Sequence, residues 1–248
     1  MKKKSKKIFW KMHKLENNPA LIKGLSRCWF RRVYVLLWLL VIPMVGYSQA
    51  ADIGLWAGVG VEKKITKKWS ANVNVQSRFT DNISVLKAYL GEVGLSYKLT
   101  KHWEVSGYYR YIARRKRNED KTGYEYRSYN RFYADLSYDH KLWKLKFDYR
   151  LRYQNQFQDD ESAAENNSSY IRNKFELSYP NKSRFTPYIS TDFFYEIGNG
   201  FDQMRNKAGV EIALNKHHKL ELSGFTDYRL IGSQENRFLI GVSYKVKF

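Results

Sequence analysis

Charged side chains that could pair with one another, or recognise charged solutes, recur at every second position along several stretches of the chain. Between residues 143 and 157, for example, Asp148, Arg150 and Arg152 all fall on even positions. In an extended chain such residues point to one side, so they form a single charged face. The candidates for this face are Arg78, Arg110, Arg131, Asp135, Asp148, Arg150, Arg152, Lys174, Asp192, Glu196, Arg205, Glu221, Arg229 and Arg237.

The opposite positions are apolar or aromatic, and this two-residue period predicts the strands that carry the charged face. The odd positions from Trp143 to Phe157 are all apolar or aromatic except Asn155. Eleven such runs follow residue 50. Each is long enough for a tilted strand of about 9–11 residues to cross a membrane. Further runs with this pattern are Trp69–Phe79, Trp103–Ala113, Phe185–Ile197, Leu220–Leu230 and Phe238–Phe248.

The connections between the runs alternate in character. One series is short and basic, as in 63–69 and 98–103, and the other is longer and more polar or acidic, as in 117–123 and 158–168. Short turns on one side and longer loops on the other are typical of outer-membrane barrels, whose strands present an apolar face to lipid and a polar face to the lumen. We therefore predict that the charged candidates line a lumen.

A soluble β-sandwich or lipocalin-like barrel is the alternative fold, with the apolar face turned inward. The positions of the aromatic residues favour the membrane barrel, because rings begin runs directly after short turns and lie near the ends of others. Rings collected at one level form a girdle at a membrane interface. The residues predicted to anchor the barrel at this interface are Trp69, Trp103, Trp143, Phe185 and Tyr244.

The predicted fold is an all-β, transmembrane, antiparallel up-and-down β-barrel of ten to twelve strands, covering residues 51–248. Bacterial single-chain barrels normally have an even number of strands, whereas eleven runs are visible. Either a twelfth strand is hidden, for example within Arg114–Tyr133, or Ile53–Val61 is not a full crossing and the barrel has ten. Of these we favour twelve.

The last residues resemble the signal by which outer-membrane proteins are recognised for insertion. The final run ends in an aromatic residue and has aromatic or apolar residues at alternate positions before it. The residues of this predicted signal are Gly241, Tyr244, Val246 and Phe248. The partner that reads it would be the barrel-assembly machinery.

Residues 1–50 have the pattern of a cleaved secretory signal peptide with a long basic start. An uncharged apolar run, Val33–Val45, follows two arginines and precedes the small residues Ser48 and Ala50. This run is too short to span a bilayer comfortably, and an uncleaved anchor helix is the alternative. A signal peptide followed by alternating aromatic strands predicts location in the outer membrane of a Gram-negative bacterium.

The formal net charge of +20 does not indicate nucleic-acid binding. Residues 1–50 carry much of the basic excess, and the remaining cations alternate with carboxylates on a face that a duplex cannot reach. The expected partners are instead the lipid bilayer and lipopolysaccharide. The single cysteine, Cys28, precedes the apolar run, so the mature chain would have no disulfide and no thiol nucleophile.

The chain also resembles the outer-membrane barrels of domain-of-unknown-function family 2490 (DUF2490). The resemblance rests on the opening DIGLW (Asp52–Trp56), the turn KKITKKWS (Lys63–Ser70) and the succession of aromatic-rich strands up to Phe248. It covers essentially the whole mature chain. It implies a barrel fold and an outer-membrane location, and it transfers no functional residue.

Two non-enzymatic functions remain open for such a barrel. A basic excess in the lumen would suit a narrow, porin-like channel for small anionic solutes, because rings of Arg and Lys select anions. Extensive charge pairing would instead give a structural barrel with a salt-bridged lumen.

The enzymatic alternative is a lipid-modifying or hydrolytic protein, which would need a Ser–His pair near the outer leaflet. The histidines that follow the signal segment are His102, His140, His217 and His218, and all lie in or beside the short basic turns. We therefore expect no catalytic residue. We also expect no cofactor and no metal site, although the acidic stretch Asp159–Glu161 with Glu165 leaves calcium binding open.

Overall fold

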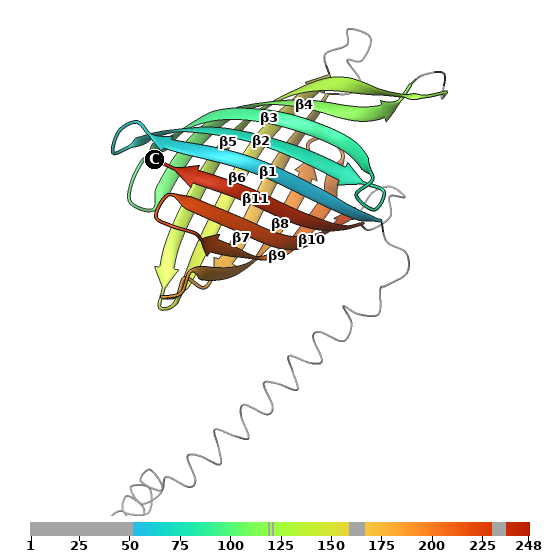
Figure 1. The fold of residues 1–248 in the computed structure, drawn as a ribbon. Coiled ribbons are helices and arrows are strands. Elements are labelled where there is room, and N and C mark those ends of the chain that lie inside the picture. Colours follow the sequence, from blue (N-terminus) through green and yellow to red (C-terminus); the bar gives the residue numbers. More distant parts are fainter. Residues whose placement is uncertain (1–51, 119, 121, 159–166, 230–236) are drawn as a thin grey trace, which may run out of the picture. The chain divides into compact units, whose positions relative to one another are not determined.

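The computed structural model describes residues 52–118, 120, 122–158, 167–229 and 237–248 (Figure 1). The chain divides into two units, 1–50 and 51–248, and the predicted signal peptide lies outside the described residues. The described strands are β1 (Ile53–Lys64), β2 (Trp69–Thr80), β3 (Val85–Lys98), β4 (Trp103–Arg117), β5 (Tyr124–Leu142), β6 (Leu145–Gln158), β7 (Ser168–Ser178), β8 (Phe185–Glu196), β9 (Gly200–Ala213), β10 (His218–Arg229) and β11 (Arg237–Lys247). No helix among these residues is long and apolar enough to span a bilayer.

The strands form one closed barrel, which confirms the predicted fold class. Strands that follow one another in the chain pair antiparallel, and the barrel closes through a parallel pairing of β1 with β11. This seam runs from Ile53 opposite Phe238 to Glu62 opposite Lys247. The barrel is therefore up-and-down everywhere except at the seam.

The preference for twelve strands is wrong, and so is the ten-stranded alternative, because the described residues form eleven. The strand β1 has 12 residues and is a full strand. The described residues of Arg114–Tyr133 form no further strand: they contain the far ends of the β4–β5 hairpin, with Arg114 opposite Arg127. The parity argument fails because it assumes antiparallel closure. Since β1 and β11 run in the same direction, an odd number of strands closes the sheet.

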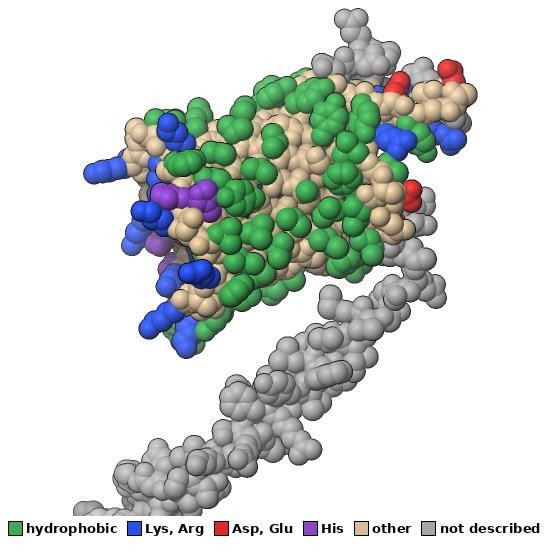
Figure 2. All heavy atoms as spheres, viewed as in Figure 1, with side chains coloured by type: hydrophobic (Ala, Val, Ile, Leu, Met, Phe, Trp, Pro, Cys, Tyr) green, Lys and Arg blue, Asp and Glu red, His purple; other side chains and the backbone are tan. Residues whose placement is uncertain are grey.

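The two ends of the barrel differ. We name the end formed by the connections 65–68, 99–102, 143–144, 179–184 and 214–217 the turn end, and the opposite end the loop end. The seam strands both run toward the turn end, so Phe248 lies there. Lys and Arg side chains gather at this end in Figure 2, as the short basic connections predict. The other series of connections forms the loop end.

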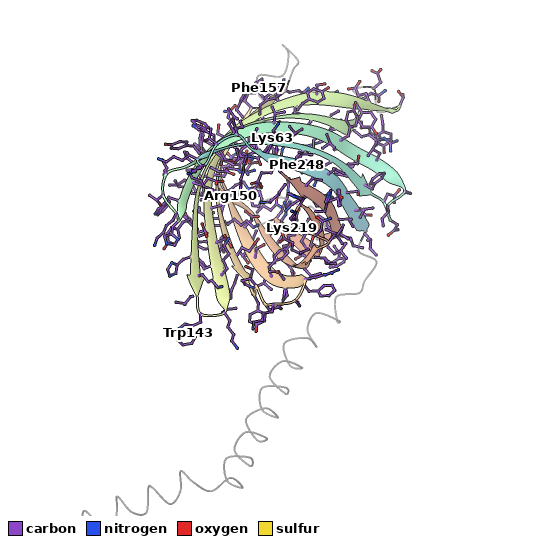
Figure 3. All side chains as sticks on the ribbon, turned by 60° about the vertical axis from the view of Figure 1, so that its left-hand side comes forward. Lys63, Trp143, Arg150, Phe157, Lys219 and Phe248 are labelled. Atoms are coloured by element: carbon purple, nitrogen blue, oxygen red, sulfur yellow. The ribbon has the colours of Figure 1, made fainter. Side chains whose placement is uncertain are left out.

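Trp143 differs from expectation, because it lies in a tight turn and does not begin a strand. The turn consists of Trp143 and Lys144, and β6 starts at Leu145. Trp143 has a φ of 55°, and 94% of its surface is exposed. Figure 3 shows it at the tip of the β5–β6 hairpin. The alternating pattern in the sequence therefore places the start of β6 two residues too early, at Trp143 and not at Leu145.

The outer wall of the barrel is apolar. Val73 and Ile189 have 51% and 61% of their surfaces exposed, and Figure 2 shows hydrophobic side chains spread over the visible wall. Polar groups on this wall pair with one another, as where the Tyr109 hydroxyl donates to Asn130 Oδ1 at 2.6 Å. An apolar surface of this extent is unfavourable in water. Internally satisfied polar groups are what a hydrocarbon environment requires.

The inner face of the sheet takes the place of a hydrophobic core. Its apolar part is small, with Leu90, Ile112 and Tyr129 in one buried cluster. The remaining inward positions are mainly polar or charged, because they alternate along each strand with the apolar residues of the outer wall. The sheet thus positions the charged face in the lumen.

Candidate functional site in the barrel lumen

A buried layer of ion pairs lies within the lumen, contributed by β5 to β8. Arg152 donates two hydrogen bonds of 2.7 Å, one to each carboxylate oxygen of Asp135. Asp192 Oδ1 lies 3.3 Å from Arg172 and 3.7 Å from Arg150. Both carboxylates and two of the three guanidinium groups are almost completely buried. We name these five residues the ion-pair layer.

Aromatic rings pack against the cations of the lumen. The guanidinium carbon of Arg152 lies 3.7 Å from the centre of the Tyr133 ring, and that of Arg172 lies 4.1 Å from the Phe194 ring. Arg205 makes two hydrogen bonds to Asp227, of 2.6 and 2.8 Å. Stacking of a cation on an aromatic ring, as at Arg152 and Arg172, is strongest where water is excluded. Such stacking lets charged groups take part in a packed interior.

Inward side chains that are at most 9% exposed come from every strand between β3 and β11. One from each strand in turn is Leu90, Ile112, Tyr133, Arg152, Arg172, Phe194, Gln203, Phe225 and Leu239. The two remaining strands contribute Trp56 and Arg78, whose ring and guanidinium group are 3.7 Å apart. Buried side chains from nine strands and half-buried ones from β1 and β2 therefore surround the lumen. We name this set the buried ring.

Nearer the turn end the lumen is more open, and its charges are paired. Glu221 accepts hydrogen bonds from Lys207 at 2.5 Å, Lys245 at 2.7 Å and the Tyr188 hydroxyl at 2.5 Å. The Lys245 side chain is 42% exposed, against 6% for Arg152. Other ion pairs in this part are Lys146–Asp148, Lys174–Glu176, Lys219–Glu211 and Lys247–Glu62. We name this part the turn-end vestibule.

Cations without a carboxylate partner lie toward the loop end. Arg78 donates to Gln76 Oε1 at 2.9 Å, Arg131 donates to Gln156 Oε1, and Arg114 lies 5.1 Å from the Tyr129 ring. Among the described residues, none of these three guanidinium groups forms an ion pair. We name Arg78, Arg114 and Arg131 the arginine cluster. Arg110 nearby is paired with Glu92.

The comparison with known families covers the described barrel as far as β10. Residues 53–230 match the family described as "Protein of unknown function (DUF2490)". The chain belongs to this family. The resemblance drawn from the sequence is thereby confirmed, and the family description assigns no activity.

One solved structure similar to this DUF2490 barrel is the beta domain of the Bordetella autotransporter Brka. The sequence identity is 13% and the TM-score is 0.45, with 71% of this chain and 80% of that chain covered. No significant match was found among curated proteins.

The remaining charged candidates lie near the ends of their strands. Glu196 ends β8 and accepts a hydrogen bond from Asn199 at 3.0 Å. Arg229 ends β10 and is exposed. Arg237 begins β11 opposite Asp227, and its side chain lies outside the described part. None of these three belongs to the ion-pair layer.

The two-residue period of the sequence does not predict that the apolar members of the buried ring face the lumen. Trp56, Phe194 and Phe225 face inward, although aromatic residues were expected on the outer wall. A signal for Trp56 is present in the sequence. Trp56 shares the even-numbered positions of β1 with Gly54 and Gly58, whereas the apolar set of this strand occupies the odd-numbered positions.

The predicted interface anchors other than Trp143 lie on the outer wall toward the turn end. Trp69 begins β2 and its ring lies 4.8 Å from that of Tyr97. Trp103 begins β4 and lies 4.9 Å from Tyr138. The other two are Phe185, which begins β8 and is 54% exposed, and Tyr244, whose hydroxyl lies 2.5 Å from His218 Nδ1.

The residues of the predicted insertion signal belong to the seam. Gly241 is opposite Trp56, and Val246 is opposite Val61. The Phe248 amide donates to the Glu62 carbonyl at 2.9 Å, and its carbonyl accepts from the Lys64 amide at 3.0 Å. The same residues therefore take part in closing the barrel.

The histidines of this DUF2490 barrel lie at the turn end. His102 Nδ1 lies 2.8 Å from the Asp139 carbonyl oxygen, and the rings of His102 and His140 are 5.5 Å apart. Within the described ranges, no group of three His, Cys, Asp or Glu could hold a metal ion. The acidic stretch considered for calcium lies mainly at 159–165, outside those ranges.

Proposed function

We propose that this DUF2490 protein is an integral barrel of the bacterial outer membrane whose lumen is closed by its own side chains. Of the functions that the sequence leaves open, this is the structural barrel with a salt-bridged lumen. The observation that carries the proposal is the buried ring, which involves all strands of the closed sheet.

The outer wall supports the membrane location. Strands of 11 to 19 residues reach or exceed the roughly 9–11 needed to cross a bilayer. The exposed apolar surface would face lipid, with lipopolysaccharide at the loop end and the barrel-assembly machinery as the partner during insertion. The aromatic pairs Trp69–Tyr97 and Trp103–Tyr138 would mark the interface at the turn end.

The ion-pair layer supports a closed lumen. Its five side chains come from the neighbouring strands β5 to β8, and on this side of the lumen Arg152 pairs with Asp135 and stacks on the Tyr133 ring. Four of the five residues are almost completely buried, so little of this side is open to water.

A narrow channel for small anionic solutes is the second candidate, favoured by the arginine cluster. Its three cations have no carboxylate partner among the described residues and lie toward the loop end, where a solute would enter. An enzymatic function has less support. All histidines after residue 50 lie at the turn end, on the other side of the ion-pair layer from the outer leaflet in the proposed orientation.

Single-channel recording of purified protein in planar bilayers tests the proposal. We expect no steady conductance from the natural chain. A variant with Tyr133→Ala, Asp135→Ala and Arg152→Ala, which removes one side of the buried ring, should conduct. A steady anion-selective current from the natural chain would overturn the closed lumen in favour of the channel.

Two further measurements separate the membrane barrel from the other classes. A folded barrel should migrate differently in gels before and after boiling, and identical migration would count against it. Hydrolysis of phospholipid or lipopolysaccharide by a variant that lacks His102, His140, His217 and His218 would refute the argument against an enzyme.

A further inference from the structure

The arginine cluster has an electrostatic cost that the described protein groups do not offset. The charge of Arg78 is repelled by four other guanidinium groups, those of Arg110, Arg114, Arg131 and Arg205. Only Arg110 and Arg205 have carboxylate partners, Glu92 and Asp227. Buried charges in folded proteins are normally paired or bound to an ion of opposite sign.

The stacking geometry leaves hydrogen-bond donors available in the cluster. The guanidinium carbon of Arg78 lies 3.7 Å from the centre of the Trp56 ring, and that of Arg114 lies 5.1 Å from the centre of the Tyr129 ring. A guanidinium group stacked by its face keeps the N–H groups of its edge for an acceptor. Among the described residues, the hydrogen-bond acceptors of Arg78 and Arg131 are single glutamine oxygens, which leave most of the five donors of each guanidinium group unused.

A second observation points to a missing acceptor in the same part of the lumen. Within the described residues, the buried side-chain atoms without a hydrogen-bond partner are Arg150 Nε, Arg172 Nε and Gln203 Nε2. All three are donors. Arg172 and Gln203 both lie opposite Phe194 in the sheet register, and Arg205 contacts the same ring. Donors without acceptors therefore extend from the arginine cluster into the ion-pair layer, to which Arg150 and Arg172 belong.

We propose that the arginine cluster is a binding site for a small tetrahedral oxyanion with two negative charges, such as phosphate or a phosphate monoester. The cations come from β2, β4 and β5, within four neighbouring strands of the barrel, so they lie at three separate points on one side of the lumen. A tetrahedral dianion presents acceptor oxygens in several directions, whereas a carboxylate presents two in one plane. This binding goes beyond the closed barrel and does not depend on conduction.

The test is calorimetric titration of the folded, detergent-purified full chain with inorganic phosphate, with glycerol phosphate and succinate as comparison ligands. We expect saturable binding of phosphate that is tighter than binding of succinate or chloride. Binding of phosphate but not of glycerol phosphate would identify the free ion as the ligand, whereas binding of both would identify a phosphate group in general.

Replacement of single cations locates the site. Arg78→Gln and Arg131→Gln should each weaken phosphate binding by about tenfold or more, since each removes charge-assisted hydrogen bonds. Lys245→Gln is the matched control, because it removes an inward cation from the turn-end vestibule and leaves Glu221 paired with Lys207. Arg131→Lys, which keeps the charge and loses the planar donor edge, should give an intermediate loss.

Three outcomes would overturn the proposal. They are no saturable phosphate binding by the natural chain, equal losses in Lys245→Gln and Arg131→Gln, and tighter binding of succinate than of phosphate. Gel migration before and after boiling checks that each variant is folded. Because conductance is measured separately, a conducting barrel that binds phosphate would refute the closed lumen and leave this site intact.

Discussion

Arg152 of β6 and Asp135 of β5 form a two-pronged ion pair inside the barrel, with both hydrogen bonds at 2.7 Å and both residues 5% exposed. The Arg152 guanidinium group also lies 3.7 Å from the centre of the Tyr133 ring, which shields it from water on one side. Buried pairs of this kind contribute little net stability relative to an apolar pair, yet removal of one partner is costly.

Asp135→Asn should therefore destabilise the barrel by about 3 kcal/mol, because it leaves Arg152 buried with a neutral partner. Urea-induced unfolding in detergent micelles, followed by tryptophan fluorescence, measures the change. The double variant Asp135→Leu with Arg152→Met should recover most of the loss. Equal destabilisation in the single and double variants would mean that packing volume matters here and charge does not.

The eleven-stranded closure predicts a specific cross-link. Ala57 of β1 lies opposite Val242 of β11 in the parallel seam. Neighbouring strands are about 4.8 Å apart, which is within the range that a disulfide bridges. In a chain with Cys28→Ser, the pair Ala57→Cys and Val242→Cys should form a disulfide on mild oxidation.

The matched control moves one cysteine along the strand. Ala57→Cys with Ile240→Cys is displaced by two residues from the register, since Ile240 lies opposite Leu55. The separation is then roughly 8 Å, too far for a disulfide. A twelfth strand between β1 and β11 would abolish cross-linking in both variants.

The aromatic residues at the turn end should differ in their effect on stability. Trp69→Ala removes a ring contact with Tyr97 at 4.8 Å and a wall residue at the proposed membrane interface, so we expect a loss of about 1 kcal/mol. Trp143→Ala should cost less than about 0.5 kcal/mol, because Trp143 projects from a turn and is 94% exposed. Unfolding of both variants in lipid vesicles gives the comparison, and a larger loss for Trp143 would contradict the assignment.

The C-terminal residue should matter for assembly more than for stability. The Phe248 ring is 64% exposed, whereas its backbone hydrogen bonds to Glu62 and Lys64 do not depend on the side chain. Phe248→Ala should change the free energy of unfolding by no more than about 0.5 kcal/mol. The amount of folded barrel in cell outer membranes should fall. Unchanged assembly in cells, together with unchanged refolding in detergent, would argue against the insertion signal.

The sequence predicts the strands better than their closure. In β6 the alternation of Arg150 and Arg152 with Tyr149 and Leu151 is a local property that assigns opposite faces directly. The failure at Trp143 is also local, because a hairpin turn with positive φ continues the apolar pattern by chance. The strand count fails for a different reason. The eleven alternating runs match the eleven described strands, whereas the even-number rule applies to barrels that close through an antiparallel pair.

Composition and period by themselves determined an all-β chain with one apolar and one charged face, because strand geometry turns a two-residue period into two surfaces. Only the tertiary structure decided that β1 pairs in parallel with β11, since pairing of strands at opposite ends of the chain leaves no local pattern. It also decided which charges meet. Arg152 received Asp135 as its partner while Arg131 received Gln156, because the register of the neighbouring strands β5 and β6 places these inward side chains opposite one another.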